Sequence, residues 1–296
     1  MNFSRWLGFG ALLAGGALCQ VRGAAPFGKG EILVGEKGRE IRVFTYKPAT
    51  FSNGPIFFVF HGMKRNAADY RDSAVPLADR HGAMVAAPFF DTNRFSSHLY
   101  PRGGIFRKDG SLRPQEDWSV TWATRILREV LEGEGDPRRE HYLIGHSAGA
   151  QFLSRYVALE PVTARRVVAA NAGTYAFPRT DWDWAYGLGK LPKSFEGEET
   201  LRRYLGAPLT VCLGKADTNN TAEAGNFDAS AEANREGLHR LERGRNFFEF
   251  GRKLAEEKKW SFGWIKVEIP EVGHDGELML KDLRMDQALE IKNKVP

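Results

Sequence analysis

The stretch that decides the fold is Glu140-His-Tyr-Leu-Ile-Gly145-His-Ser147-Ala-Gly149-Ala. A short apolar run over 141–144 leads into the pattern G-x-S-x-G, and a helical pattern follows over 148–159. A strand that turns abruptly into a helix strains the backbone of its corner residue and needs small neighbours two positions away. Ser147 is predicted to occupy that corner, with its hydroxyl exposed at a helix N-terminus that favours negative charge. The alternative is that the two glycines serve only a tight turn.

Apolar, β-branched and aromatic runs recur along the rest of the chain, with helical patterns between them. Strands are predicted at 31–34, 40–46, 55–60, 83–88, 141–144, 166–171, 209–213 and 265–269. Helices are predicted near 67–80, 117–133, 148–159, 196–205, 230–258 and 276–292, and two long irregular stretches occupy 91–116 and 173–195. The first two strands are expected to form an antiparallel hairpin. The alternation beyond them predicts an α/β fold whose mostly parallel, eight-stranded sheet carries helices on both faces. Such sheets bind ligands beyond the carboxyl ends of their strands, so functional residues should directly follow strands.

A nucleophilic serine needs a base that takes its proton, and two histidines follow Ser147 in the chain. His239 falls inside a predicted polar helix and is interpreted as a surface or packing residue. His274 directly follows a strand, and Gly273 and Gly276 free the backbone around it to aim the ring. His274 is therefore predicted to be the base, the alternative being an incidental histidine in a helix-capping turn.

The base in turn needs an acid that fixes its tautomer, and in a sheet of this kind the chain order is serine, acid, histidine. Asp217 follows the strand at 209–213 after a short turn and is predicted to be this acid. Asp181 and Asp183 compete for the role, but their surroundings are more typical of a pocket wall or a solvated turn. Asp275, next to the histidine, is interpreted as a helix N-cap.

Two backbone N–H groups are expected to bind the oxyanion of the reaction. One belongs to Ala148, the residue after the nucleophile. The other is assigned to Met63, because the strand at 55–60 runs into His61-Gly62, where the glycine permits a sharp bend. His61 is interpreted as a structural residue that holds this loop by a hydrogen bond.

His61-Gly62, Gly145-His-Ser-Ala-Gly149, Gly214-Lys-Ala-Asp217 and Gly273-His274-Asp275 together resemble the α/β-hydrolase superfamily. More narrowly, they resemble its secreted esterases related to polyhydroxybutyrate depolymerases and feruloyl esterases. The resemblance extends from the first hairpin to the final helix, which makes 24–296 one catalytic domain, and no large helical cap domain is evident in the sequence. It implies that a small-molecule or polymeric carboxylic ester is hydrolysed through an acyl-enzyme, with no metal and no organic cofactor.

The two irregular stretches bear on the substrate. In the second, Tyr175, Trp182 and Trp184 are predicted to wall the site for an aromatic or bulky group. The alternative is that these aromatic rings pack the loop down. The first stretch carries His98, Arg102, Arg107 and further polar and basic residues, such as Arg94 and Tyr100. These could meet a carboxylate or a sugar acid, but the preferred interpretation is a solvated, loosely basic loop.

The N-terminus is typical of an export signal. Arg5 precedes an uncharged apolar run over 6–18, and small residues follow at which a signal peptidase could cut, after Gly23 or Ala25. The run is shorter than the about 20 residues that cross a bilayer. We predict a signal peptide over 1–23 and a secreted or periplasmic protein. A buried N-terminal helix is the alternative.

Composition and charge exclude several classes of protein. The 296 residues are 42% hydrophobic and 27% charged, as in a globular protein able to bury a core. Loss of 1–23 removes Arg5 and Arg22 and no acid, so the net charge falls by two from +5. The sequence contains no run of basic residues that would predict nucleic-acid binding, and no membrane association is expected after the signal peptide is cleaved. One cysteine, Cys212, would remain in an apolar run, and is predicted to be buried. A monomer is expected.

Two competing functions stay open. A peptidase of the same fold would usually bring a propeller or cap domain. A catalytically inactive hydrolase fold kept for binding is the other possibility, although every position of the predicted triad holds a competent residue type.

Overall fold

The computed structural model describes residues 23–221 and 227–291. The predicted export segment lies outside the described residues except for its last position, and stays a prediction. The strands are β1 (Gly28–Val34), β2 (Ile41–Lys47), β3 (Ile56–Phe60), β4 (Met84–Pro88), β5 (His141–His146), β6 (Arg166–Ala170), β7 (Leu209–Gly214) and β8 (Ile265–Ile269). All eight predicted strands are therefore confirmed, with ends that differ by three residues at most.

The strands form one sheet in the order β1-β2-β4-β3-β5-β6-β7-β8. β1 pairs antiparallel with β2, as the predicted hairpin requires, and β2 pairs antiparallel with β4. From β4 to β8 every pairing is parallel. The predicted fold class is confirmed: the carboxyl ends of β3 to β8 meet at one edge, with β5 near the centre.

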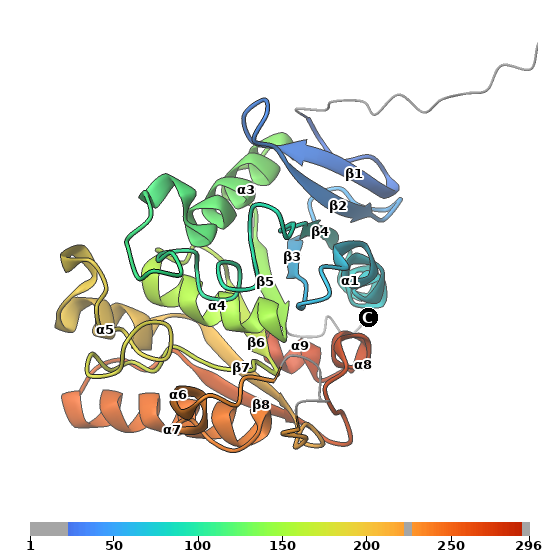
Figure 1. The fold of residues 1–296 in the computed structure, drawn as a ribbon. Helices are drawn as coiled ribbons and strands as arrows, with labels where there is room; N and C mark the ends of the chain where they lie inside the picture. Colours follow the sequence, from blue (N-terminus) through green and yellow to red (C-terminus); the bar gives the residue numbers. More distant parts are fainter. Residues whose placement is uncertain (1–22, 222–226, 292–296) are drawn as a thin grey trace, which may run out of the picture.

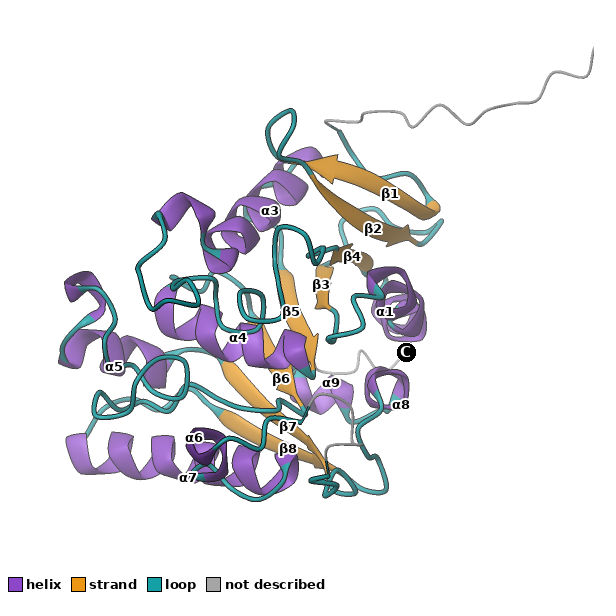
Figure 2. Ribbon diagram, in the orientation of Figure 1, coloured by secondary structure: helices purple, strands orange, loops and turns teal. Residues whose placement is uncertain are grey.

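Helices cover both faces of this sheet, as Figures 1 and 2 show. They are α1 (Ala67–Ser73), α2 (Val75–His81), α3 (Ser119–Gly133), α4 (Ala148–Leu159), α5 (Glu198–Gly206), α6 (Ala231–Asn234), α7 (Arg240–Lys258), α8 (Gly276–Lys281) and α9 (Met285–Ala288), with short 3₁₀ turns at Gln115–Asp117 and Lys193–Phe195. β3 shows why a layer of helices forms on each face of the sheet. All five of its residues are buried, and their side chains point alternately to the two faces. Ile56, Phe58 and Phe60 join the core under α3, α4, α5 and α7, whereas Phe57 and Val59 join the core under α1, α2, α8 and α9.

Three predicted helices are interrupted. The segment near 67–80 divides at Ala74, because Pro76 has no N–H to continue the helix and suits only a first turn. The segment 230–258 divides into α6 and α7, and His239 is the N-cap of α7 rather than a residue inside a helix. Its ring nitrogen accepts the backbone N–H of Glu242 at 3.2 Å. The segment 276–292 divides where Asp282 adopts an extended backbone.

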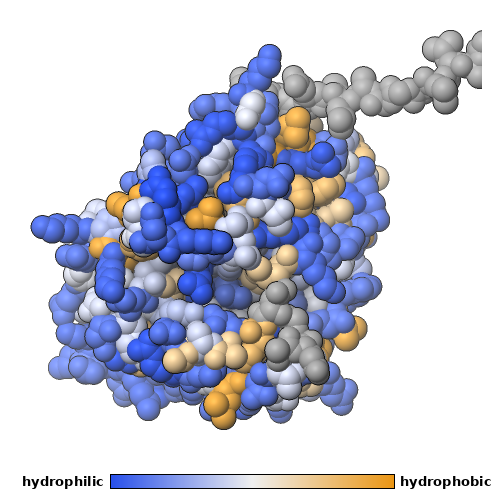
Figure 3. All heavy atoms as spheres, viewed as in Figure 1, coloured by the Kyte–Doolittle hydropathy of each residue, from blue (hydrophilic) through white to orange (hydrophobic). Residues whose placement is uncertain are grey.

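The two long irregular stretches run over the carboxyl edge of the sheet, after β4 and β6, on the side that α4 covers. Figure 3 shows mostly hydrophilic side chains on the face where the first of them crosses in front of α4 in Figure 1. In the described part of the chain, no helix combines the length and hydropathy of a membrane span.

Candidate active site

The turn between β5 and α4 has the strained geometry predicted for it. Ser147 has φ 57° and ψ −116°, a region that L-residues rarely adopt, and is the N-cap of α4. A Cβ on Gly145 would lie 2.5 Å from the Gly149 carbonyl carbon, and one on Gly149 would lie 2.1 Å from the Phe60 carbonyl oxygen. Only glycine lets β3, β5 and α4 approach this closely, which holds the serine at the carboxyl edge of the sheet.

Ser147, His274 and Asp217 lie together, although they follow three different strands, β5, β8 and β7. Ser147 Oγ lies 2.9 Å from His274 Nε2, and His274 Nδ1 lies 2.8 Å from Asp217 Oδ2. A carboxylate can only accept, so Nδ1 carries the ring hydrogen and Nε2 is free to accept the serine proton. The Asp217 side chain is 1% exposed and the His274 ring 24%, so Asp217 lies in the interior and His274 at the surface of a cavity. The spacing is that of a nucleophile, a base and an orienting acid.

Asn171 ties the loops of the acid and the base to each other, and sequence reasoning did not single it out. Its amide nitrogen donates to the Gly273 carbonyl oxygen at 2.8 Å, and its amide oxygen accepts from Gly214 N at 2.7 Å. It is 1% exposed and has a positive φ of 49°. The positive φ of Asn171, directly after β6, thus directs its side chain to the segments that follow β8 and end β7.

Arg240 is a second residue that the sequence did not indicate. It is the first residue of α7, is 2% exposed, and places Nη1 3.5 Å from Asp217 Oδ1, the oxygen that does not face the histidine. Burial lowers the pKa of Arg240 and the carboxylate opposes that change. The guanidinium therefore lies against the side of the carboxylate that is turned away from the histidine.

The loop after β3 brings Met63 to the same cavity as Ser147, and Ala148 is the first residue of α4. The N–H of a first helical residue has no intrahelical acceptor, so that of Ala148 is available to an anion. His61 holds the loop, as predicted: it is fully buried, Nε2 accepts from Phe90 N at 3.1 Å, and Nδ1 lies 2.9 Å from the Gly62 carbonyl oxygen. Burial lowers the pKa of His61 to about 3, so the ring is neutral.

His146, next to the serine, is also neutral, because burial lowers its pKa well below the usual value. Its Nδ1 lies 2.8 Å from the Tyr70 hydroxyl, and its ring centroid lies 4.8 Å from that of His274. Tyr70, Ser73 and Lys64 line the same cavity, whose volume is about 560 Å³. No group of three or more potential metal ligands occurs in the described part of the chain.

The predicted aromatic wall is not brought to this cavity. Tyr175 is fully buried, and its ring stacks on Phe247 of α7 at 4.5 Å, so the prediction that it meets substrate was wrong. Trp182 packs against Phe177, with a centroid distance of 5.2 Å, which fits the alternative of a loop packed down. Trp184 lines a different cavity.

The other acids that competed with Asp217 have partners of their own. Asp181 pairs with Arg179, and Asp183 with Lys190 at 2.6 Å. Asp275 is the predicted N-cap, accepting from Glu277 N and Leu278 N at 2.9 Å. Cys212 is buried, as predicted.

An eight-stranded, mostly parallel sheet with a serine elbow after its fifth strand defines the α/β-hydrolase fold. Solved structures agree. The poly(3-hydroxybutyrate) depolymerase LpqC from Bordetella parapertussis is 32% identical over 86% of this chain and 88% of its own, with a TM-score of 0.79. Poly(aspartic acid) hydrolase-1 from Sphingomonas sp. KT-1 is 33% identical over 89% and 98%, with a TM-score of 0.80. The chain belongs to the family of α/β-hydrolase-fold esterases.

A siderophore hydrolase, EstA from Aspergillus nidulans, shares the fold alone, at 17% identity over 96% of this chain and 99% of its own, with a TM-score of 0.50. No protein-family model matches the sequence, and no curated protein does. The structural relatives are hydrolases, which sets the coarse class of the chain.

Proposed function

We propose that this protein is a serine hydrolase that cleaves carboxylic esters through an acyl-enzyme. The observation that carries the proposal is the continuous hydrogen-bonded series from Ser147 Oγ through the His274 ring to Asp217, at 2.9 and 2.8 Å. This series ends at a strained, cavity-facing serine on a helix N-terminus, where an alkoxide-like nucleophile is best stabilised.

The chemistry follows from the geometry. Ser147 Oγ attacks the ester carbonyl carbon while His274 Nε2 takes the hydroxyl proton, and Asp217 stabilises the resulting imidazolium. The carbonyl oxygen becomes an oxyanion and binds the N–H groups of Met63 and Ala148, each worth about 10²–10³ in rate. His274 then gives its proton to the leaving alcohol as the C–O bond breaks. A water molecule repeats the sequence on the acyl-enzyme and releases the acid and free Ser147.

Labelling by a fluorophosphonate, which reacts only with an activated serine, tests the nucleophile. The wild-type protein should label and Ser147→Ala should not. Ser73→Ala is the matched control, because Ser73 lines the same cavity. We expect this variant to label like the wild type. Absence of labelling in the wild type, or labelling that survives Ser147→Ala, would refute the proposal and favour a hydrolase fold kept for binding.

Amide hydrolysis is the second candidate function, and one observation favours it. The Sphingomonas relative is a poly(aspartic acid) hydrolase, and the backbone of that polymer is an amide, whereas poly(3-hydroxybutyrate) is an ester. A nucleophilic serine with a protonated histidine can expel either an alcohol or an amine. Turnover of an ester and an anilide with the same acyl group separates the two functions. A kcat/KM for the anilide equal to or above that for the ester would make the protein an amidase.

A further inference from the structure

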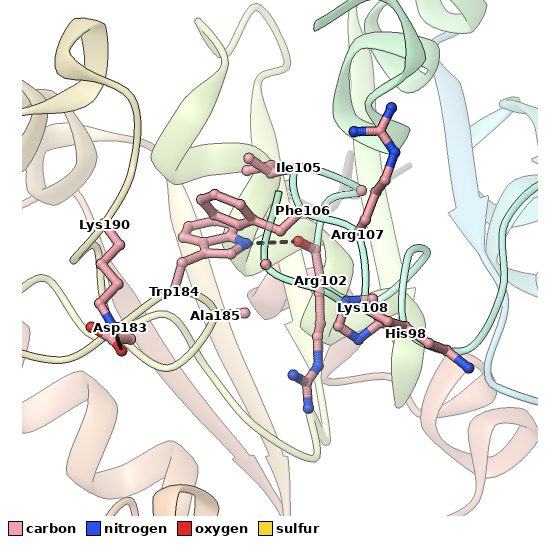
Figure 4. A pocket seen from close by; sticks show the side chains of 12 residues that line it. His98, Arg102, Ile105, Phe106, Arg107, Lys108, Asp183, Trp184, Ala185 and Lys190 are labelled. Atoms are coloured by element: carbon pink, nitrogen blue, oxygen red, sulfur yellow. Dashed lines mark hydrogen bonds and ion pairs between the residues drawn. The ribbon is translucent and has the colours of Figure 1, made fainter. Parts of the chain in front are cut away.

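The cavity that holds Ser147 is separate from a second one, of about 360 Å³. Parts of the loops after β4 and β6 line the second cavity, and Figure 4 shows the Trp184 indole nitrogen donating to the Arg102 carbonyl oxygen, at 2.9 Å, where the two loops meet. Among the described residues, none lines both cavities. The cavity of Ser147 is thus bounded by side chains of its own, and one of them is Tyr70 of α1.

The Tyr70 hydroxyl lies between segments that carry the proposed catalytic groups. Its oxygen is 2.8 Å from Nδ1 of His146, the residue before the nucleophile. A Cβ on Gly62 would lie 3.0 Å from the same oxygen and 3.6 Å from Ser147 Cβ. A Cβ on Gly276 would lie 2.9 Å from both the hydroxyl oxygen and His146 Nδ1. A side chain at either glycine would therefore crowd the hydrogen bond between Tyr70 and His146.

The hydroxyl is the donor in this hydrogen bond. Burial raises the pKa of Tyr70, so the hydroxyl keeps its proton, and the backbone of Gly62 opposes that change. Burial lowers the pKa of His146 well below its usual value, so its ring is neutral and carries one hydrogen. Nδ1 is the acceptor that the described residues give the Tyr70 hydroxyl, so the hydrogen of the ring is on Nε2.

This hydrogen bond connects the two segments that supply the proposed oxyanion donors. Met63 directly follows Gly62, and Ala148 lies two residues after His146. Both N–H groups must come within about 2.7–3.1 Å of one oxyanion, so the separation of the two segments has to be held within narrow limits. The His146 ring also packs against that of His274, with a centroid distance of 4.8 Å. A shift of His146 would therefore reach the proposed base as well.

We propose that Tyr70 is a positioning residue, whose hydroxyl holds the oxyanion loop (residues 61–64) at a fixed distance from the turn that carries Ser147. The inference rests on the proposed function and adds to it a residue outside the triad and the backbone donors. The hydroxyl hydrogen is committed to His146, so it does not act on the substrate. Without the hydroxyl, every reacting group stays present but the two N–H donors are less well aligned, which affects the transition state more than the bound substrate.

Tyr70→Phe tests this role, because it removes the hydroxyl and keeps the ring. With a short neutral p-nitrophenyl ester we expect kcat about tenfold lower and KM unchanged, since displacing a donor costs less than the about 10²–10³ of losing one. The inhibition constant of an alkyl trifluoromethyl ketone should rise by the same factor, because the serine adds to the ketone and creates an oxyanion.

Tyr204→Phe is the matched control for Tyr70→Phe. It removes a buried hydroxyl that donates to the Ala176 carbonyl oxygen at 2.9 Å, outside the lining of the active-site cavity. Per folded molecule, this variant should keep the wild-type kcat and the wild-type inhibition constant. Urea denaturation of each variant gives the folded fraction.

Variants at His146 show whether the hydrogen bond is the cause. His146→Asn keeps an acceptor near the position of Nδ1, whereas His146→Leu, of similar size, has none. With Tyr70 present, the asparagine variant should retain a higher kcat than the leucine variant, and in the Tyr70→Phe background the two should be equal. Tyr70→Phe/His146→Leu should be no slower than His146→Leu alone. Losses that multiply in the double variant would show that the two side chains act separately, which would overturn the role.

The outcomes distinguish this role from the proposed chemistry. A Tyr70→Phe protein with wild-type kcat and inhibition constant would overturn the role of Tyr70 and leave the serine hydrolase standing. A rise in KM alone would make the hydroxyl a substrate contact and would overturn it too, as would an equal loss per folded molecule in Tyr204→Phe. A wild type that neither turns over the ester nor binds the ketone would refute the proposed function, and the role of Tyr70 with it.

Discussion

Replacing Gly149 by alanine tests whether the elbow depends on close approach of α4 to β3. The new Cβ would lie 2.1 Å from the Phe60 carbonyl oxygen and 2.7 Å from its carbon. Ordinary van der Waals contact begins at 3.4 Å, so the helix and the strand must separate by about 1.3 Å. Overpacking of this kind lowers the free energy of unfolding by roughly 1–3 kcal/mol. Because Ser147 caps the same helix, a displacement of about 1 Å should also lower kcat/KM about 10²-fold.

Gly206→Ala is the matched control for Gly149→Ala. Gly206 is the last residue of α5, and the one atom near its added Cβ is the Ser261 carbonyl oxygen at 3.9 Å. This variant should be as stable as the wild type or up to about 1 kcal/mol more stable. Urea denaturation gives the stabilities, and turnover of a short neutral ester, normalised to the folded fraction, gives the activity. A Gly149→Ala protein with wild-type stability and turnover would refute the steric argument, and so would an equal loss in Gly206→Ala.

Three further predictions concern buried groups. Burial in the folded state lowers the pKa of His61 to about 3, whereas a histidine in the unfolded chain binds a proton below about pH 6.5. The free energy of unfolding should therefore be highest above pH 6.5 and should fall as the pH drops towards 3. Denaturation at several pH values should show a shallower fall for His61→Gln, and an unchanged slope would contradict the assignment. Arg240→Met leaves the Asp217 carboxylate buried without its cation and should lower the free energy of unfolding by roughly 3–5 kcal/mol. Adding Asp217→Asn should recover part of that loss in urea denaturation, and a double variant no more stable than the single one would exclude the ion pair as its cause. Burial raises the pKa of the Cys212 thiol to about 12, so a thiol reagent at pH 8 should modify the protein only after it unfolds. Rapid reaction of the native protein would show instead that the sulfur is accessible.

Strands and the elbow could be predicted because each rests on local chemistry. A five-residue apolar run such as Ile56–Phe60 can be buried on both faces only inside a parallel sheet. Gly145 and Gly149 on either side of Ser147 indicate a close approach of strand and helix backbones, and this signal does not depend on the rest of the sequence. Asp217 and His274 could be predicted to meet because each follows a strand after a short turn, and parallel strands bring such positions to one edge.

Other parts of the site depend on contacts between distant segments, which no local pattern encodes. Arg240 matters because the start of α7 reaches the end of β7, and a helical arginine is ordinarily a solvated residue. Tyr175 follows β6 as a substrate residue would, but α7 covers it with Phe247, and burial of that kind is set by packing. His239 was predicted inside a helix, but Gly237, with φ 150°, separates α6 from α7 just before it. A single glycine inside a polar helical pattern is only a weak signal that the helix ends there.

The order in which the strands enter the sheet has a consequence for the timing of biosynthesis. The proposed oxyanion loop follows β3, the proposed nucleophile follows β5, the proposed acid follows β7, and the proposed base follows β8. A nascent chain can therefore build the elbow well before it holds His274, the proposed base. Under the proposed mechanism, Ser147 therefore gains its base only once β8 has paired with β7.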